Sequence, residues 1–257
     1  MRTPENISKV KISLYSSLAV RKMRKRHGLF VVEGEKCVAD TLGTFELEAV
    51  VATPEWFGKT SLVFDGNKAR SASETELKKI SSLSTPPEVL AVYRIPVTAD
   101  PVIPNGDELC VALDGVQDPG NLGTIIRTAH WFGVKRIYCS LDTVDLYNTK
   151  TIQASMGSVG KVEVTYCDLP EFLADCGERG IKIYGTALEG ENLYEAKLSN
   201  GGIIVMGNEG NGVSATVREK TGRFLFIPPY SPTDHSESLN VSIATAVILS
   251  AFRSERK

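Results

Sequence analysis

GGIIVMGNEGNGVS, residues 201–214, holds the most informative pattern in this chain. An apolar, strand-like run from Ile203 to Met206 is followed by a loop in which three glycines surround a single carboxylate, Glu209. Glycine is common where a strand ends in a turn with φ > 0, so the loop can be a simple strand stop. Glycines also let backbone close on a ligand, and open α/β sheets bind small molecules at the carboxyl ends of their strands. This stretch alone leaves both interpretations open.

Strand-like runs recur on both sides of this loop. They fall at residues 109–116, 136–141, 161–167, 182–188, 202–207 and 224–229. Helical stretches separate most of them, and the runs are apolar throughout rather than alternating. Such strands are typical of a parallel sheet that is covered on both faces. The sequence therefore predicts an α/β fold for residues 109–257.

A linker is predicted between this region and a second patterned region. RIPVTADPVIPNGDE, residues 94–108, is rich in residues that interrupt helices and strands. The stretch before it combines strands at 29–32, 47–53 and 88–95 with a capped helix within 71–83. We therefore expect a small α/β domain at 1–95, a linker at 96–108 and a second domain at 109–257.

Composition excludes several classes of protein. The 257 residues are 42% hydrophobic, which is usual for a globular protein, and no apolar run approaches a membrane span. The first residues lack the apolar core of a signal peptide, so we expect a cytoplasmic protein without membrane contact. Five scattered cysteines, with no paired spacing and no histidine cluster, predict reduced thiols and no metal site.

Positive charge is concentrated near the N terminus although the net charge is −2. The phrase RKMRKRHG supplies Arg21, Lys22, Arg24, Lys25 and Arg26. Such a run is often just the solvated end of a helix. It can equally contact the phosphates of RNA or DNA, with an affinity that depends on salt.

Polar residues also follow the predicted strand at 109–116. Residues 118–120 predict a turn, and Asn121 opens a helix with apolar residues at helical spacing. Arg127 falls away from that apolar stripe, where an arginine is ordinarily a solvated side chain. The spacing Asn-x-Gly-x-x-x-Arg makes a functional role worth testing.

A third polar cluster precedes the last predicted helix. After a strand that ends near Ile227, Ser238, Asn240 and Ser242 stand at the head of an almost wholly apolar helix that runs to about Phe252. Serine at an N-cap explains Ser238. It does not explain why the other two polar residues follow at once.

Two nucleotide-binding classes are disfavoured by the glycine spacing. The order Gly-x-x-Gly-x-Gly after residue 206 differs from the dinucleotide fingerprint, and no Gly-Lys-Ser/Thr forms a phosphate loop. The chain is therefore unlike a nicotinamide-dependent or nucleoside-triphosphate-dependent enzyme.

The three clusters together resemble the three motifs of the SpoU/TrmH branch of the SPOUT methyltransferases. The matching residues, in order, are Asn121-x-Gly123-x-x-x-Arg127, then Met206-Gly207-Asn208-Glu209-Gly210-x-Gly212, then Ile227-Pro228 followed by Ser238-Leu239-Asn240-Val241-Ser242-x-Ala244. That family transfers a methyl group from S-adenosylmethionine to a ribose 2'-oxygen of tRNA or rRNA. The resemblance is strong over residues 109–253 and weaker over 7–95, which looks like the family's RNA-binding domain.

The resemblance implies a role for each matching residue. Catalytic roles are implied for Asn121, Arg127, Glu209, Ser238 and Asn240. Walls of a site for S-adenosylmethionine, with S-adenosylhomocysteine as product, are implied for Thr186, Ala187, Leu188, Met206, Gly207, Asn208, Gly210, Ile227 and Leu239. Glycines 207 and 210 are expected to let backbone approach the cofactor. The loop 228–237 is longer than the family pattern and lacks its usual glycine, so the comparison is secure only after it.

The resemblance also implies a trefoil knot and a homodimer. A knot would be an exception to the rule that chains avoid threading. The dimer has independent support, because the last predicted helix is apolar on nearly every side and a monomer would expose part of it. We expect one subunit's N-terminal domain to help hold rRNA or tRNA at its partner's site.

Two alternative functions remain open at this point. One is a noncatalytic RNA-binding protein with a degenerate methyltransferase domain, and the other is a methyltransferase that acts on a base. The retained polar residues of all three motifs argue against the first.

Overall fold

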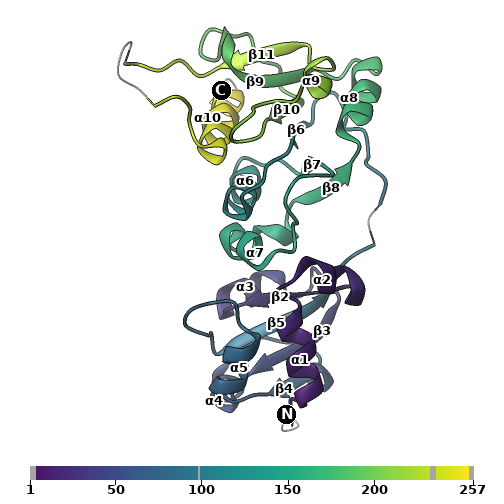
Figure 1. Cartoon of the computed structure of the whole chain (residues 1–257), viewed down its shortest axis with the longest axis vertical. Coiled ribbons are helices and arrows are strands. Elements are labelled where there is room, and N and C mark those ends of the chain that lie inside the picture. Colours follow the sequence, from purple (N-terminus) through teal and green to yellow (C-terminus); the bar gives the residue numbers. More distant parts are fainter. Residues whose placement is uncertain (1–3, 98, 232–235, 255–257) are drawn as a thin grey trace. The chain divides into compact units, whose positions relative to one another are not determined.

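The structure is a computed structural model that describes residues 4–97, 99–231 and 236–254. The chain forms two compact units. The N-terminal unit contains residues 1–97 and 145–160, and the C-terminal unit contains residues 98–144 and 161–257. Figure 1 labels the helices and strands of both units.

The N-terminal unit is a mixed sheet with helices. Its elements are β1 (Glu5–Asn6), α1 (Lys9–Ser17), α2 (Arg21–His27), β2 (Leu29–Glu33), α3 (Glu35–Thr41), β3 (Leu47–Ala52), α4 (Pro54–Lys59), a 3-10 turn (Gly66–Lys68), β4 (Ala69–Ser71), α5 (Glu74–Ile80) and β5 (Val89–Arg94). The strand order is β1-β4-β3-β5-β2, and β5 runs antiparallel to both of its neighbours. The expected α/β character of this region is confirmed, but the sequence did not separate α1 from α2.

Apolar residues of α1 and α5 bury one face of this sheet. Ile12 and Tyr15 of α1 and Leu77 of α5 share a buried cluster with Val31 and Val92 of the strands. The start of α5 is fixed by a reciprocal cap in which Glu76 accepts from the backbone N–H of Ser73 at 2.9 Å.

A segment from the middle of the chain completes the N-terminal unit. Residues 145–160 include α7 (Thr149–Ser155) and a 3-10 turn (Ser158–Gly160), and they pack here rather than with the rest of 109–257. Gln153 Nε2 donates to the carbonyl of Glu33 at 3.0 Å. A Cβ added at Gly157 would lie 2.5 Å from Asp40 Cβ, so only glycine permits this approach. The unit boundary thus differs from the sequence-based one because such long-range contacts leave no local pattern.

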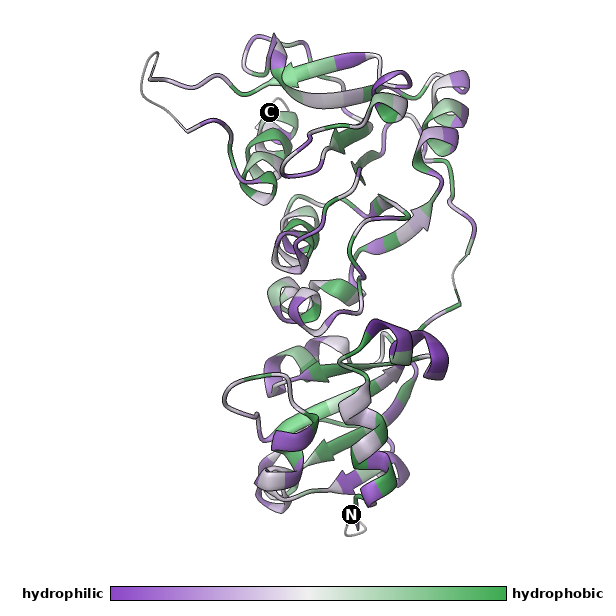
Figure 2. Cartoon of the chain, viewed as in Figure 1, coloured by the Kyte–Doolittle hydropathy of each residue, from purple (hydrophilic) through white to green (hydrophobic). Residues whose placement is uncertain are grey.

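The C-terminal unit is built on one parallel sheet of six strands. Its elements are β6 (Leu109–Leu113), α6 (Pro119–Trp131), β7 (Arg136–Ser140), β8 (Glu163–Cys167), α8 (Leu169–Glu178), β9 (Ile183–Asn192), β10 (Gly202–Met206), α9 (Ala215–Arg218), β11 (Arg223–Phe226) and α10 (Val241–Ser254). The strand order is β11-β9-β10-β6-β7-β8, and every pairing is parallel. Helices α6 and α10 lie on one side of the sheet and α8 on the other (Figure 1). The predicted parallel sheet is confirmed, and the buried strands are the hydrophobic segments of Figure 2.

The strand order brings the first two polar clusters together. Strand β10 pairs with β6 although about ninety residues separate them, and Met206 lies opposite Leu113. From β6 the chain continues outward through β7 and β8, whereas β9 and β11 lie beyond β10. The carboxyl ends of β6 and β10 therefore flank a topological switch point, where open α/β sheets bind ligands.

Two helices begin at residues other than those expected. Helix α6 starts at Pro119, and Asp118 is its N-cap, accepting from the backbone N–H of Asn121 at 2.9 Å. Helix α10 starts at Val241, so Ser238 is not its cap. At α6 the side chain of Asp118, earlier than the expected start, satisfies a free backbone N–H of the first turn. At α10 the side chain of Asn240, later than the expected start, does the same.

The strand order does not define how the chain is threaded, so the trefoil knot stays a prediction.

Candidate functional site

The loop after β10 is held by the side chain of Asn208. Its Oδ1 accepts from the backbone N–H groups of Gly210 and Asn211 at 2.9 and 3.0 Å. Its Nδ2 donates to the carbonyl of Gly115 at 2.7 Å, which ties this loop to the turn after β6. The backbones of Asn208 and Gly212 exchange two hydrogen bonds of 2.9 Å. The side chain of Asn208 therefore stabilises the conformation of the loop, in addition to any contact with a ligand.

Glycine occupies positions 207, 210 and 212 of this loop for different physical reasons. A Cβ on Gly207 would lie 2.2 Å from the carbonyl carbon of Gly212 and 2.3 Å from the nitrogen of Val213. Gly212 has φ +66°, a left-handed conformation that favours glycine. The φ of Gly210 lies outside the left-handed region, and the nearest atom to a Cβ added there would be Asn208 Oδ1 at 3.6 Å. Close packing of the loop on itself thus excludes a Cβ at Gly207, whereas Gly210 borders open space. Approach of the cofactor to either backbone stays a prediction.

Glu209 joins the loop to the start of α6. Its carboxylate accepts from Asn121 Nδ2 at 2.9 Å and from the backbone N–H of Gln117 at 3.2 Å. Partial burial by itself would raise the pKa of Glu209. The hydrogen bonds from Asn121 and from nearby backbone N–H groups outweigh that effect and lower the pKa below its ordinary value. Glu209 is therefore an ionised group that only accepts hydrogen bonds at neutral pH.

The third cluster extends this contact into a continuous chain of hydrogen bonds. Asn240 Nδ2 donates to Asn121 Oδ1 at 2.9 Å. Asn240 Oδ1 in turn accepts from the backbone N–H of Ser242 at 2.9 Å and from its hydroxyl at 2.7 Å. The chain runs Ser242–Asn240–Asn121–Glu209 and joins the ends of β6 and β10 to the start of α10.

Both ends of this chain determine the orientation of its two amides. An N–H at Ser242 can only donate, and the Glu209 carboxylate can only accept. Asn121 must therefore turn its NH₂ group toward Glu209 and its oxygen toward Asn240. Among the residues that the structure describes, each amide keeps one further N–H without a partner. The chain can thus present two oriented donors to an oxygen of a bound substrate.

Two residues expected in this group lie outside the hydrogen-bond chain. Arg127 is exposed, as its position off the apolar stripe of α6 predicts, and it pairs with no other residue of the described part. On an ideal helix it is about 9 Å farther along the axis than Asn121. Ser238 is exposed, and its carbonyl accepts from the hydroxyl of Ser236 at 3.3 Å. The structure therefore unites Asn121, Glu209 and Asn240, and leaves Arg127 free to meet another molecule.

The residues expected to line a cofactor site fall into exposed and buried groups. Leu188 is 64% exposed and Leu239 is 48% exposed, so two large apolar side chains are open to a ligand. Thr186 donates to the carbonyl of Val205 at 3.0 Å, and Ala187 and Ile227 are half-buried. Met206 is 2% exposed and its carbonyl accepts from the N–H of Asp114, so its side chain belongs to the core.

No sequence motif predicts the residues that support the turn after β6. Ser140, at the end of β7, accepts from the N–H of Gly115 at 2.8 Å and donates to Asp142 at 2.6 Å. The buried carboxylate of Asp114 accepts from the N–H of Ser214 at 2.6 Å. These bonds hold the turn that anchors Asn208. Only the acidic residue at a strand end could have been noticed beforehand.

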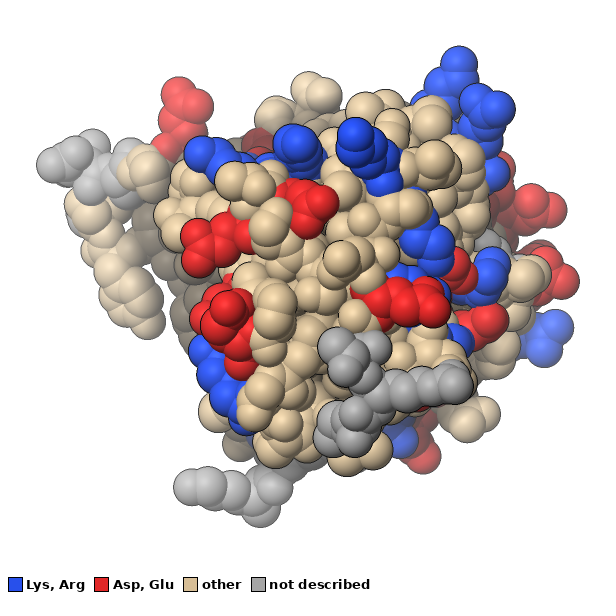
Figure 3. All heavy atoms as spheres, turned by 90° about the horizontal axis from the view of Figure 1, so that it is seen from below, with Lys and Arg blue, Asp and Glu red and all other residues tan. Residues whose placement is uncertain are grey.

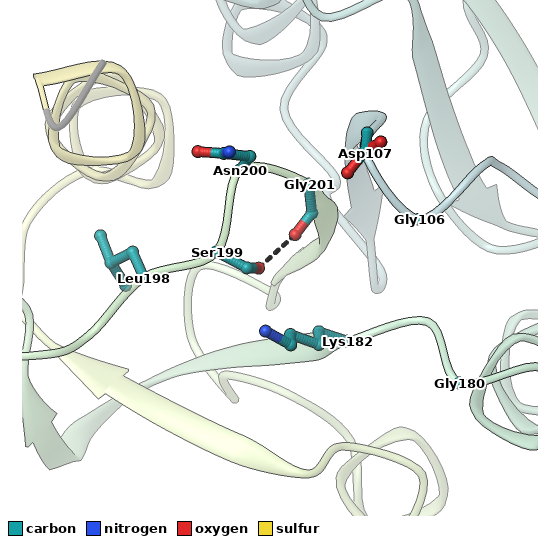
Figure 4. Close-up of a pocket in the computed structure, with 8 residues that line it drawn as sticks. All are labelled: Gly106, Asp107, Gly180, Lys182, Leu198, Ser199, Asn200 and Gly201. Carbon is teal, nitrogen blue, oxygen red and sulfur yellow. Dashed lines mark hydrogen bonds between the residues drawn. The ribbon is translucent and has the colours of Figure 1, made fainter. Parts of the chain in front are cut away.

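A separate cavity lies at the opposite ends of the same strands. It has a volume of about 370 Å³ and is lined by Asp107, Lys182, Ser199 and Asn200, among others (Figure 4). Lys182 and Asp107 precede β9 and β6, so this cavity is at their amino ends. The motif residues are at the carboxyl ends, and the cavity is therefore distinct from the site they form.

The predicted RNA-contacting residues are mostly exposed on α2. Arg21, Lys22, Lys25 and Arg26 are exposed, and Figure 2 shows this helix as hydrophilic. Arg24 is different, because it is only 2% exposed and its guanidinium pairs with Asp145 at 2.6 Å. It also donates to the carbonyl of Leu18 at 2.7 Å. The expectation that Arg24 contacts RNA is therefore wrong, since its charge holds residue 145 in the N-terminal unit.

No helix in the described part of the chain is long and apolar enough to cross a membrane. Among these same residues, no group of three His, Cys, Asp or Glu side chains is arranged to hold a metal ion.

The fold defines an α/β protein with a parallel sheet, and the motif residues meet at its topological switch point. Residues 108–250 match the SpoU rRNA methylase family, and residues 9–91 match the MRM3-like substrate binding domain. The chain belongs to the SpoU rRNA methylase family, which confirms the resemblance seen in its motifs.

Relatives match nearly the whole chain. The 23S rRNA (guanosine(2553)-2'-O)-methyltransferase RlmP of Bacillus subtilis is 31% identical over 98% of this chain and all of its own length. A solved structure of a candidate TrmH-family RNA methyltransferase from Porphyromonas gingivalis is 37% identical, with a TM-score of 0.87 over 96% of this chain and 98% of its own. The AdoMet-bound rRNA methyltransferase of Sinorhizobium meliloti is 26% identical, with a TM-score of 0.85 over 98% of this chain and 97% of its own.

Proposed function

We propose that this protein transfers a methyl group from S-adenosylmethionine to a ribose 2'-hydroxyl of ribosomal RNA. The observation that carries the proposal is the hydrogen-bond chain Ser242–Asn240–Asn121–Glu209, which unites three separate motifs at one switch point. A noncatalytic protein has no need of two amides oriented in this way. The names of the relatives, several of them rRNA 2'-O-methyltransferases, favour rRNA over tRNA.

The carboxyl ends of β9 and β10 suit the proposed cofactor. The exposed side chains of Leu188 and Leu239 offer apolar contact to an adenine ring, and Gly210 leaves space beside the loop. When bound, S-adenosylmethionine supplies an activated methyl group on a sulfonium. The protein therefore has to position the acceptor in line and stabilise its oxygen.

The acceptor hydroxyl requires help from the protein. A ribose hydroxyl has a pKa far above neutral, so its proton must be removed or its developing charge stabilised. We assign the stabilisation of the developing charge to Arg127, whose permanently charged guanidinium is free of partners within the described part of the chain, and the displaced hydroxyl proton passes to solvent. The remaining N–H groups of Asn121 and Asn240 would orient the ribose, while Glu209 and Ser242 keep the two amides in place. Ser238 stays in the proposed site as an exposed hydroxyl at its border.

RNA binding is assigned to the exposed cations of α2. Between residues 6 and 32 the chain carries seven Lys and Arg and no Asp or Glu. The face seen in Figure 3, at the end that holds the N terminus, carries both signs of charge. Because the net charge of the chain is −2, attraction of a polyanion has to come from a local cluster such as α2. An rRNA substrate also implies action in the cytoplasm, where the five buried, reduced cysteines are stable.

The C-terminal unit supports the further proposal of a homodimer. Helices α6 and α10 pack against each other. Trp131 at the end of α6 is 84% exposed, and Ile243 on α10 is 52% exposed. One side of α10 is buried within its own unit, and half-buried Val247 and Ala251 continue the outer stripe from Ile243. A second copy would cover these apolar side chains by twofold symmetry.

One experiment separates this function from both alternatives. Purified protein is incubated with methyl-labelled S-adenosylmethionine and total RNA, and the RNA is digested to nucleosides. Label on a ribose 2'-oxygen of rRNA is expected. Label on a base would identify a base methyltransferase, and RNA binding without label would identify a noncatalytic binder.

A further inference from the structure

An open apolar groove lies between α1 and α2 of the N-terminal unit. It has a volume of about 520 Å³ and is lined by Val10, Ser13 and Leu14 of α1 and by Met23 and His27 of α2, with Lys9 and Ser17 at its border. Val10 is 79% exposed although it is aliphatic. An apolar groove in the middle of a basic surface has no role in contacting phosphates.

The helical geometry of α2 separates its cations into two groups. At about 100° per residue, Met23 and His27 share one face, which is the face that lines the groove. Arg26 and Lys22 lie within roughly 60–100° of Met23, on its exposed flank, whereas Arg21 and Lys25 point about 160° away. Lys22 and Arg26 are exposed, and neither they nor His27 pair with another described residue. The groove is therefore bordered by two available cations.

We propose that this groove receives an unpaired base of the RNA, with Lys22 and Arg26 contacting the adjoining phosphates. This inference rests on the proposed function, since it specifies how the assigned RNA-binding surface selects its substrate. Bases outside a helix expose flat, weakly hydrated faces, which pack on apolar and imidazole side chains. The hydroxyl of Ser13 and the imidazole of His27 add hydrogen-bonding groups at the base edge.

Charge complementarity selects this occupant over others. A double-stranded RNA keeps its bases stacked and offers only phosphates and 2'-hydroxyls, which need no apolar groove. A second copy of the same surface is disfavoured, because the exposed cations of α2 would meet like charges (Arg21, Lys22, Lys25 and Arg26). A flipped or looped nucleotide combines the anionic and apolar parts that the groove and its border present.

A single substitution at an exposed position can block the groove. Ser13→Leu places an aliphatic side chain in the groove, changes no charge and keeps a good helix former on α1. Ser61→Leu makes the same change at an exposed position outside the groove and serves as the matched control. The double variant Lys22→Ala/Arg26→Ala tests the phosphate contacts separately.

Binding is measured by fluorescence anisotropy with the full chain and two RNA probes. One probe is a hairpin with an unpaired loop, and the other is a fully paired duplex with the same stem. Ser13→Leu should weaken hairpin binding about tenfold and duplex binding less than twofold, whereas the double variant should weaken both. Ser61→Leu should match the wild type on both probes. Thermal unfolding of each variant shows that its fold is retained.

The inference and the proposed function fail in different ways. If the wild type methylates rRNA but Ser13→Leu binds the hairpin normally, or weakens both probes equally, the groove does not receive a base. If the wild type binds neither probe and transfers no methyl group, both fail together. A change in sedimented mass on Ser13→Leu would identify the groove as a contact between copies and overturn the inference.

Discussion

Gly207→Ala tests whether the loop after β10 is held by its own packing. The new Cβ would lie 2.2 Å from the Gly212 carbonyl carbon and 2.3 Å from the Val213 nitrogen, both of them backbone atoms. These distances fall more than 1 Å short of the ~3.5–4.0 Å at which carbon atoms normally meet. The backbone must therefore move, and the paired hydrogen bonds between Asn208 and Gly212 would be strained. Overpacking of this kind costs about 1–3 kcal/mol or more.

Thermal unfolding and calorimetric binding of S-adenosylmethionine together measure the effect. With about 2–4 °C lost per kcal/mol in a protein of this size, Tm should fall by roughly 2–12 °C. Cofactor affinity should fall too, because the loop would shift beside Gly210, where the cofactor is proposed to lie. Methyl transfer should fall because Glu209 would lose its hold on Asn121. Gly210→Ala is the matched control, since its Cβ has no neighbour closer than 3.6 Å. The Gly210→Ala variant should keep the wild-type Tm and lose only affinity for S-adenosylmethionine. A Gly207→Ala protein with wild-type Tm and affinity would refute the reasoning.

Three further predictions follow from the site and the helices around it. Arg127→Ala should reduce methyl transfer by about 10²–10³ while leaving Tm and cofactor affinity unchanged, and near-wild-type turnover in a single-turnover assay would contradict its assigned role. Because the pKa of Glu209 is lowered in the folded protein, its stabilising contribution is present above the unfolded value of about 4.3 and is lost as pH falls through the folded value. The stability difference between the wild type and Glu209→Gln in urea unfolding should therefore shrink below about pH 4, and a constant difference down to pH 2 would show that the carboxylate contributes nothing. Val247→Glu should convert the expected dimer to the 27.9 kDa monomer in sedimentation, whereas an intact dimer would place the interface elsewhere.

Local pattern was sufficient for the strands, the α/β class and the family. Strand-like runs predicted all six strands of the C-terminal sheet. The runs are most continuously apolar at β6, β7 and β10, because a strand buried on both faces needs apolar residues at every position. The motif spacing likewise identified Asn121, Glu209 and Asn240, which the fold brings into contact. The exposure of Arg127 followed from helical periodicity alone.

Contacts between distant residues were decided by the tertiary structure. Arg24 looked like one more cation in a basic run, but the fold buries it against Asp145, 121 positions later. Gly207 looked like a site for ligand approach, yet its space is limited by the loop's own backbone. Ser242 became part of the site only when Asn240 capped α10 and turned its amide toward Asn121. Periodicity and spacing report which face of an element is buried, whereas the partner of a side chain depends on how strands far apart in sequence are ordered in the sheet.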